Sequence, residues 1–167
     1  NNDVDYILYL INATQPFIKD DFIYLKYISN KVDINKVVFV INKVDEFDVE
    51  LESVKNFFSN LKEYLSNFGF VSPVIFATSA YHALILKKLA KQESLTRKEI
   101  RVLSQLIEDD VENQFLQCLN LSKEVALQVE RRNYFEFLGE DFKDKEILNR
   151  IYCKTGFPYF EEWQSKT

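Results

Sequence analysis

The chain has 167 residues, of which 47% are hydrophobic and 28% are charged, a composition typical of one soluble globular domain. It carries a net charge of −5, and its 21 Lys and Arg residues are scattered along the sequence, so a nucleic-acid partner is disfavoured. Only three Gly and three Pro residues are present, which excludes an all-β fold with many tight turns and favours long helices.

The sequence also indicates where the protein is located and whether the chain is part of a longer protein. No apolar run approaches the roughly 20 residues that cross a bilayer, and the first residues lack the pattern of a signal peptide, so we expect a cytoplasmic protein. Cys118 and Cys153 have no CxxC or His spacing around them, which is typical of reduced thiols. The chain contains no Met and enters a strand-like run after a few residues, so we expect a fragment of a longer protein.

Three short apolar runs predict β-strands in the first ninety residues. They are "YILYLINA" (6 to 13), "VVFVI" (37 to 41) and "VIFATSA" (74 to 80). Each run is nearly continuous rather than alternating, which is typical of strands covered on both faces in a parallel sheet.

Helical patterns separate these runs. Residues 20 to 30 place apolar side chains broadly on one side, and residues 48 to 69 repeat them at spacings of three and four. Gly69 and then Pro73 are expected to end the second helix before the next strand begins. The order strand, helix, strand, helix, strand predicts an open α/β sheet built from two right-handed crossovers.

Polar residues follow two of the predicted strands at the point where each strand ends. Asn42, Lys43 and Asp45 leave the second strand, and Ser79 and Ala80 leave the third. Ligands of open α/β sheets bind at the carboxyl ends of the strands, so we expect these residues to converge on one pocket.

The residue types in this pocket match a guanine base. The Asp45 carboxylate accepts two hydrogen bonds side by side, and guanine offers two adjacent donors, its ring N–H and its exocyclic amine. Asn42 is placed to bond the imidazole side of the purine and to tie the two loops together, and the stem of Lys43 to lie over the base. A backbone N–H near Ala80 is then expected to reach the guanine carbonyl oxygen. An N-K-x-D tetrapeptide also occurs by chance, but here it directly follows one strand while S-A follows the next.

With "NKVD" and "TSA" in place, the first half resembles P-loop GTPases, and the wider pattern resembles the dynamin superfamily, especially bacterial dynamin-like proteins and the mitofusin-type branch. The stretch "DYILYLINATQPFIKDDFIYLKYI" is similar to the segment that follows DxPG in those proteins. The stretch "KTGFPYFEEW" (154 to 163) resembles the entry into the closing helix of such a GTPase domain. The resemblance implies that residues 1 to 93 are the C-terminal half of a GTPase domain, and that residues 94 to 167 complete it and start a helical bundle.

The resemblance also implies an activity for a full-length parent protein. Such a protein would bind GTP or GDP with Mg²⁺, hydrolyse GTP, self-associate and remodel membranes, with peripheral membrane association. This chain has no GxxxxGK[ST] loop, no switch Thr and no DxPG, so it represents a partial P-loop GTPase fold and is expected to be inactive alone.

From residue 94 onward the sequence predicts helices only. Thr96 and Glu99 have the spacing of a capping box at the start of a long amphipathic helix that runs to Leu119. A second helix is expected from about Ser122 to a break near Gly139, and a third follows over "KDKEILNRIY". Such apolar stripes are typical of core packing.

Other residues and other functions stay open. His82 follows the S-A loop, but a catalytic role would need a partner nucleophile and acid, and the spacing places none. Arg131 and Arg132 match an arginine finger or a phosphate contact, although exposed helix charges are commoner. The alternatives to a dynamin-like GTPase are a ribosome- or RNA-associated GTPase, which the negative charge opposes, and a non-catalytic helical adaptor with a degenerate nucleotide fold.

Overall fold

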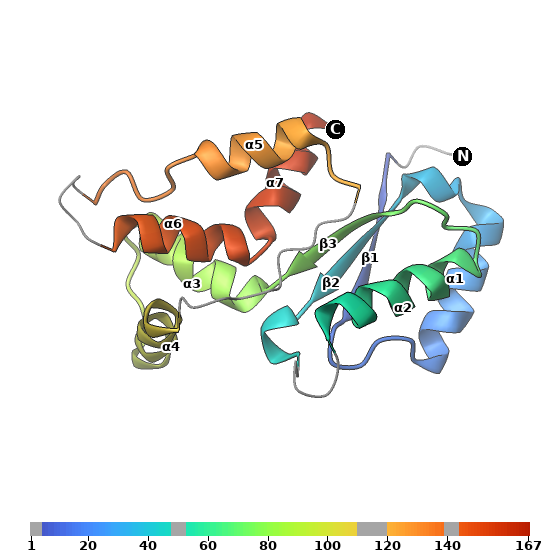
Figure 1. Cartoon of the computed structure of the whole chain (residues 1–167), viewed down its shortest axis with the longest axis horizontal. Coiled ribbons are helices and arrows are strands. Elements are labelled where there is room, and N and C mark those ends of the chain that lie inside the picture. Colours follow the sequence, from blue (N-terminus) through green and yellow to red (C-terminus); the bar gives the residue numbers. More distant parts are fainter. Residues whose placement is uncertain (1–4, 48–52, 110–119, 139–143) are drawn as a thin grey trace.

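A computed structural model of the chain describes residues 5 to 47, 53 to 109, 120 to 138 and 144 to 167, and these residues form an α/β fold (Figure 1). The strands are β1 (Ile7–Asn12), β2 (Val37–Asn42) and β3 (Val74–Thr78). The α-helices are α1 (Lys19–Lys31), α2 (Val54–Ser66), α3 (Ala80–Ala90), α4 (Arg97–Glu108), α5 (Lys123–Arg131), α6 (Lys145–Lys154) and α7 (Phe157–Lys166); two 3₁₀ turns are η1 (Ile34–Lys36) and η2 (Val44–Glu46).

The three strands form one parallel sheet in the order β1-β2-β3, which confirms the predicted strand, helix, strand, helix, strand arrangement. In register, Asn12 of β1 lies opposite Asn42 of β2, and Asn42 lies opposite Thr78 of β3. The last residue of each strand is therefore polar, and these three residues form one row at the carboxyl end of the sheet. This row is the base on which the candidate site is built.

Helices cover both faces of the central strand. On one face, α1 and α2 contribute Leu25 and Leu61 to a core that includes Phe39 of β2. On the other face, α5 and α7 pack against Val38 and Phe76. Burial from both sides explains why β2 is apolar at five successive positions.

The outer strand β1 differs from the expectation that every strand is covered on both faces. Tyr9 and Ile11 face the core beneath α1 and α2, but Leu8 is 41% exposed and Leu10 is 65% exposed. The reason is that α5 and α7 pack over β2 and β3 and reach this face of β1 only at its start, where the ring of Trp163 of α7 lies 5.0 Å from the ring of Tyr6. The outer strand therefore presents a partly exposed apolar face.

The helix α1 also departs from its predicted burial. Only Leu25 is buried on this helix, whereas Phe22, Ile23 and Tyr27 are half exposed or more. Ile23 and Tyr27 are four residues apart and share a side, but Leu25 is about 200° around the helix from Ile23. The apolar residues of 20 to 30 thus occupy two sides of the helix, and the outer side is exposed next to β1.

The ends of α2, α4 and α5 follow ordinary capping chemistry. Ser53, Thr96 and Ser122 each accept a backbone N–H of the first helical turn, and Thr96 forms the predicted capping box with Glu99. Beyond α2, Gly69 adopts a positive φ of 89°, as expected of a helix-terminating glycine. The start of the predicted helix at 48 to 52 lies outside the described residues.

The helical half is less continuous than the sequence predicts. α4 ends at Glu108, and the rest of the predicted helix, including Cys118 and Leu119, lies outside the described residues, as does Gly139. The prediction of one helix from Ser122 to about Gly139 is wrong, because α5 ends at Arg131.

Asn side chains explain that early end. Asn133 accepts the backbone N–H of Phe135 at 3.1 Å, and Asn149 of α6 accepts the backbone N–H of Tyr134 at 2.8 Å. These bonds replace the helical ones after Arg131 and let the fully buried Phe135 enter the core of the helical half.

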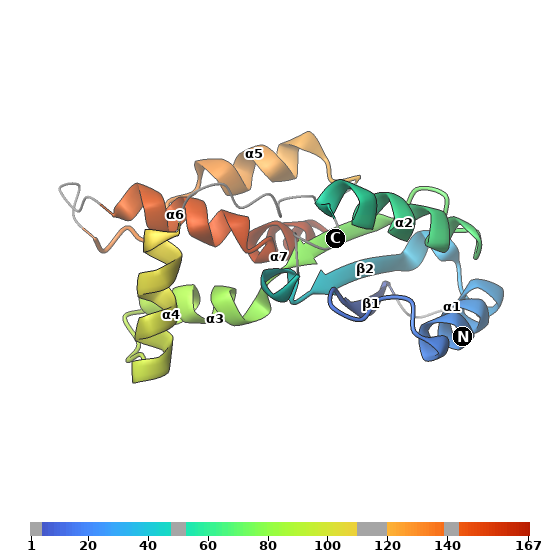
Figure 2. The same cartoon turned by 60° about the horizontal axis from the view of Figure 1, so that its bottom comes forward.

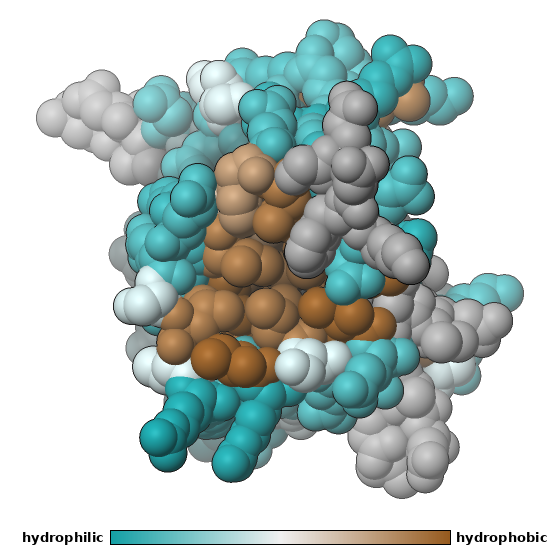
Figure 3. Space-filling model, turned by 90° about the vertical axis from the view of Figure 1, so that its left-hand side faces the viewer, coloured by the Kyte–Doolittle hydropathy of each residue, from teal (hydrophilic) through white to brown (hydrophobic). Residues whose placement is uncertain are grey.

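The helical half extends from the sheet in one direction. Figure 2 shows α4 and α6 at one end of the molecule and α1 at the other, while α5 and α7 pack against the sheet. The end formed by the helical half carries an apolar area (Figure 3), where partly buried apolar side chains surround the core of that half. Across the described ranges, no helix combines enough length and apolar character to cross a membrane.

Candidate functional site

The side chain of Asn42 joins the loops that follow β2 and β3. Its Oδ1 accepts the backbone N–H of Ala80 at 3.0 Å and lies 3.3 Å from the Oγ1 of buried Thr78. Two loops that are 36 residues or more apart in sequence are thereby held by one amide oxygen. The structure thus brings together Asn42 and Ala80, as the order of the strands predicts, although the Ala80 N–H here bonds Asn42.

Lys43 and Asp45 take their positions from a sharp turn at the end of β2. Lys43 has a positive φ of 66°, which turns the chain into the single 3₁₀ turn η2. Val44 packs in the core and fixes the position of that turn. Asp45 is the next residue of the same turn. The Lys43 ammonium lies 3.3 Å from the Glu46 carboxylate in an exposed pair, so its stem is directed by a neighbour in the same turn.

A cavity of about 330 Å³ opens between this end of the sheet and the helical half. The sheet side contributes Asp45, Ser79 and His82, and the opposite wall comes from α4 and the end of α6. The lining residues of that wall are Val102, Gln105, Leu106, Asp109, Ile151, Lys154 and Thr155. Two of the residues predicted from sequence, Asp45 and Ser79, therefore face the same space.

The polar group of Ser79, one of the residues that line the cavity, lacks a partner. Its side chain is buried, with 3% of the residue exposed, and its Oγ bonds no atom of the described residues. An unpaired buried hydroxyl costs about 1 to 3 kcal/mol. An unpaired hydroxyl on a residue that lines the same cavity as Asp45 is suited to a hydrogen bond with a ligand.

The turn between α6 and α7 holds the helical half against Ser79. Ser79 directly follows β3, and its N–H donates to the Thr155 carbonyl at 2.8 Å. Gly156 has a φ of 70°, and a Cβ on it would lie 1.7 Å from the Ala77 carbonyl oxygen. The Thr-Gly pair was visible in sequence only through the family resemblance, and its contact with the site was not predicted.

His82 lies next to Asp45 on the sheet side of the cavity. Its Nε2 is 3.9 Å from the Asp45 Oδ2, and both side chains are about four-fifths buried, with 21% and 18% exposed. Burial lowers the pKa of His82, while the charge of Asp45 opposes that shift. His82 is therefore a neutral imidazole beside a carboxylate near pH 7.

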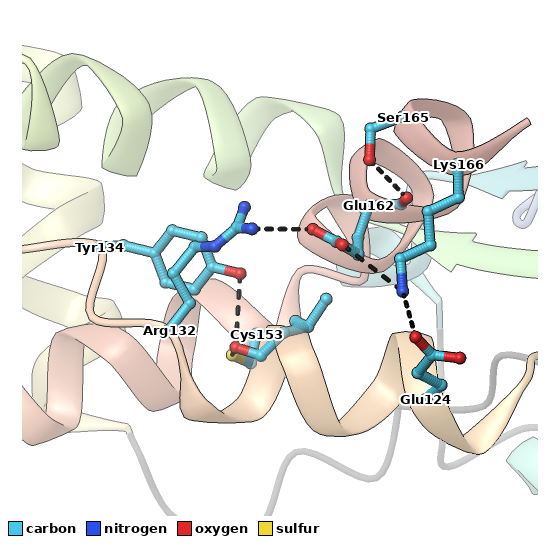
Figure 4. A network of polar contacts seen from close by, with 8 residues as sticks. Glu124, Arg132, Tyr134, Cys153, Glu162, Ser165 and Lys166 are labelled. Carbon is cyan, nitrogen blue, oxygen red and sulfur yellow. Dashed lines mark hydrogen bonds and ion pairs between the residues drawn. The ribbon is translucent and has the colours of Figure 1, made fainter.

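The second arginine of the Arg131 and Arg132 pair has a structural contact (Figure 4). Arg132 donates to the Glu162 carboxylate at 2.9 Å, and Glu162 is buried. Lys166 lies 3.9 Å from Glu162 and 3.4 Å from Glu124 of α5. This network fastens the end of α5 to α7, so Arg132 is explained without a phosphate contact.

No group of three or more His, Cys, Asp or Glu side chains is arranged to bind a metal ion in the part of the chain that the structure describes. Comparison with protein-family models, with curated proteins and with solved structures finds no match. The resemblance to dynamin-like GTPases therefore rests on the residues of this chain alone.

Proposed function

We propose that this chain recognises the guanine base of a nucleotide at the carboxyl ends of β2 and β3. The observation that carries the proposal is the link from Asn42 to Ala80, which sets the two loops side by side while Asp45 and Ser79 open into one cavity. In this reading Asp45 accepts from the ring N–H and the exocyclic amine of guanine. The buried hydroxyl of Ser79 then bonds the Asp45 carboxylate or the base.

The site would select guanine over adenine by its pattern of donors and acceptors. Adenine carries an acceptor where guanine carries its ring N–H, so it would leave the Asp45 carboxylate without a partner. A site that hydrogen-bonds one ligand rejects an analogue lacking the group, because its buried polar atoms stay unpaired. The carboxylate is thus the element that decides the choice of base.

We further propose that the parent protein is a dynamin-like GTPase, of which residues 1 to 93 form the base-reading half of the GTPase domain. The exposed apolar face of β1, where Leu8 and Leu10 lie in register with buried residues of β2, supports further structure packed over this strand in that protein. Phosphate binding, Mg²⁺ and hydrolysis would belong to the P-loop, switch Thr and DxPG that this sequence lacks. A ribosome-associated GTPase would share the base site, and a non-catalytic adaptor would not bind the base.

The proposal is tested by titrating the ¹⁵N-labelled chain with guanosine, inosine and adenosine. We expect guanosine to shift the backbone amides of Asp45 and Ala80 and to bind with weak, millimolar affinity, because each base hydrogen bond contributes only about 0.5 to 3 kcal/mol. Inosine lacks the exocyclic amine and should bind several-fold more weakly.

Adenosine should leave both amides unshifted, and the chain alone should bind GTP poorly and hydrolyse none. Equal binding of adenosine and guanosine would show that Asp45 does not read the base. Absence of any shift with all three nucleosides would favour the adaptor.

A further inference from the structure

We propose that His82 is a positioning residue that controls the Asp45 carboxylate, so that protonation of His82 weakens guanine binding. This inference rests on the proposed function of Asp45, and it adds a residue and a pH dependence that guanine reading does not require.

The geometry places His82 beside the carboxylate in the lining of the same cavity. His82 lies in the first turn of α3, and Asp45 lies in η2, with 3.9 Å between the His82 Nε2 and the Asp45 Oδ2. That separation is too long for a hydrogen bond, so the neutral imidazole leaves both carboxylate oxygens available to a base. A small rotation of either side chain would close it.

The charges around His82 favour Asp45 as its partner. Within the described residues, the charged groups that line the same cavity are Asp45 from η2, Asp109 at the end of α4, and Lys154 at the end of α6. On α3 itself, the ring of Tyr81 lies 6.1 Å from the imidazole ring. Of these groups, Asp45 has a carboxylate oxygen 3.9 Å from the His82 Nε2, and its charge favours the imidazolium.

Protonation changes what Asp45 offers to a base. An imidazolium beside the carboxylate draws an oxygen toward itself and reduces the negative charge that strengthens hydrogen bonds to guanine. The linkage is reciprocal, because a base that occupies Asp45 disfavours the imidazolium and lowers the pKa of His82 further. Guanine affinity should then be full above the His82 pKa and should fall as the pH falls below it.

The experiment uses the fact that His82 is the only histidine of the chain. Its imidazole resonances are followed by NMR from pH 5 to 8, with and without saturating guanosine, which carries no phosphate to titrate. We expect guanosine to lower the His82 pKa and its own affinity to decrease at low pH, by about tenfold for each unit of that shift.

Two variants separate this effect from a general loss of structure. His82→Gln keeps a neutral polar side chain that cannot be protonated in this range, so its guanosine affinity should be the same at pH 5 and pH 8. Asp45→Asn should lower the pKa of His82 without any ligand, whereas Glu46→Gln in the same turn should change it little.

The outcomes distinguish the two proposals. If guanosine binds the wild type with equal affinity at pH 5 and pH 8, His82 does not control Asp45, and the base site itself stands. If His82→Gln keeps the pH dependence, another group causes it, and the inference is again overturned. If guanosine does not bind at any pH, the proposed function and this inference fail together.

Discussion

At the scale of single residues, Asn42 connects the fold to the candidate site. It ends a fully apolar strand, and its Oδ1 accepts both the Ala80 N–H and the Thr78 hydroxyl at the end of the neighbouring strand. A hydrophobic residue at this position would leave the Ala80 N–H without this acceptor, whereas the Thr78 hydroxyl could still donate to the Ile41 carbonyl at 3.3 Å. The amide therefore stabilises the loop arrangement independently of any ligand.

Replacing Asn42 tests this structural role. Asn42→Ala removes the acceptor of the Ala80 N–H and should lower the free energy of unfolding by about 1 to 3 kcal/mol, the usual cost of leaving a buried donor unpaired. Asn42→Asp keeps an oxygen acceptor and should lose less. The matched control is Asn12→Ala, because Asn12 sits at the same register in β1 but its side chain accepts from the exposed Thr14 of the next turn. Urea unfolding of the three variants measures the difference, and equal losses for Asn42→Ala and Asn12→Ala would refute the role.

The sequence predicts part of this residue-level picture and misses part of it. Asn42, Asp45, Ser79 and Ala80 could be placed together because the carboxyl ends of parallel strands meet at one edge of a sheet. The missed contact is the bond from Ser79 to Thr155, which spans 76 positions of the chain. A local sequence pattern cannot predict this hydrogen bond, because the bond depends on how α6 and α7 pack against β3.

At the scale of elements, the turn between α6 and α7 decides how the helical half meets the sheet. Gly156 both reverses the chain between two helices and passes close to the backbone of β3. A side chain at this position would collide with the Ala77 carbonyl, and the backbone conformation itself disfavours any residue with a Cβ.

The substitution Gly156→Ala should therefore be severely destabilising, by about 3 kcal/mol or more, because neither the backbone of β3 nor the φ of the turn can relax cheaply. Gly69→Ala is the matched control. Gly69 also has a positive φ, but a Cβ there meets no atom within 4 Å, so only the conformational cost of about 1 kcal/mol applies. Thermal unfolding followed by circular dichroism compares the two, and similar losses of stability would contradict the close approach at Gly156.

Elements with strong periodicity and caps were predictable, and elements that depend on tertiary bonds were not. The Thr96 capping box and the helix-stopping role of Gly69 follow from local chemistry, and the structure confirms them. The end of α5 at Arg131 could not be predicted, because Asn149 of a later helix supplies the competing hydrogen bond. The apolar residues of α1 were predicted to share one buried side of the helix, whereas they lie on two sides and most of them are exposed.

At the scale of the whole molecule, the sheet half and the helical half meet at the cavity that contains Asp45, Ser79 and His82. One wall comes from the ends of two strands, and the opposite wall comes from α4 and α6. A ligand in this cavity would therefore touch both halves. The fold class was predictable from the pattern of apolar runs, but the shared cavity was not, because the sequence gives no distance between α4 and the strand ends.

Guanine reading by Asp45 is tested most directly by comparing the guanosine and xanthosine affinities of the wild-type chain and of the Asp45→Asn variant. An asparagine offers one acceptor and one donor, which match the ring N–H of xanthine and the carbonyl that replaces the guanine amine. We predict that the wild type prefers guanosine and that Asp45→Asn prefers xanthosine, while Glu46→Gln keeps the wild-type preference. Unchanged guanosine preference in Asp45→Asn would contradict the assignment of Asp45 as the residue that reads the base.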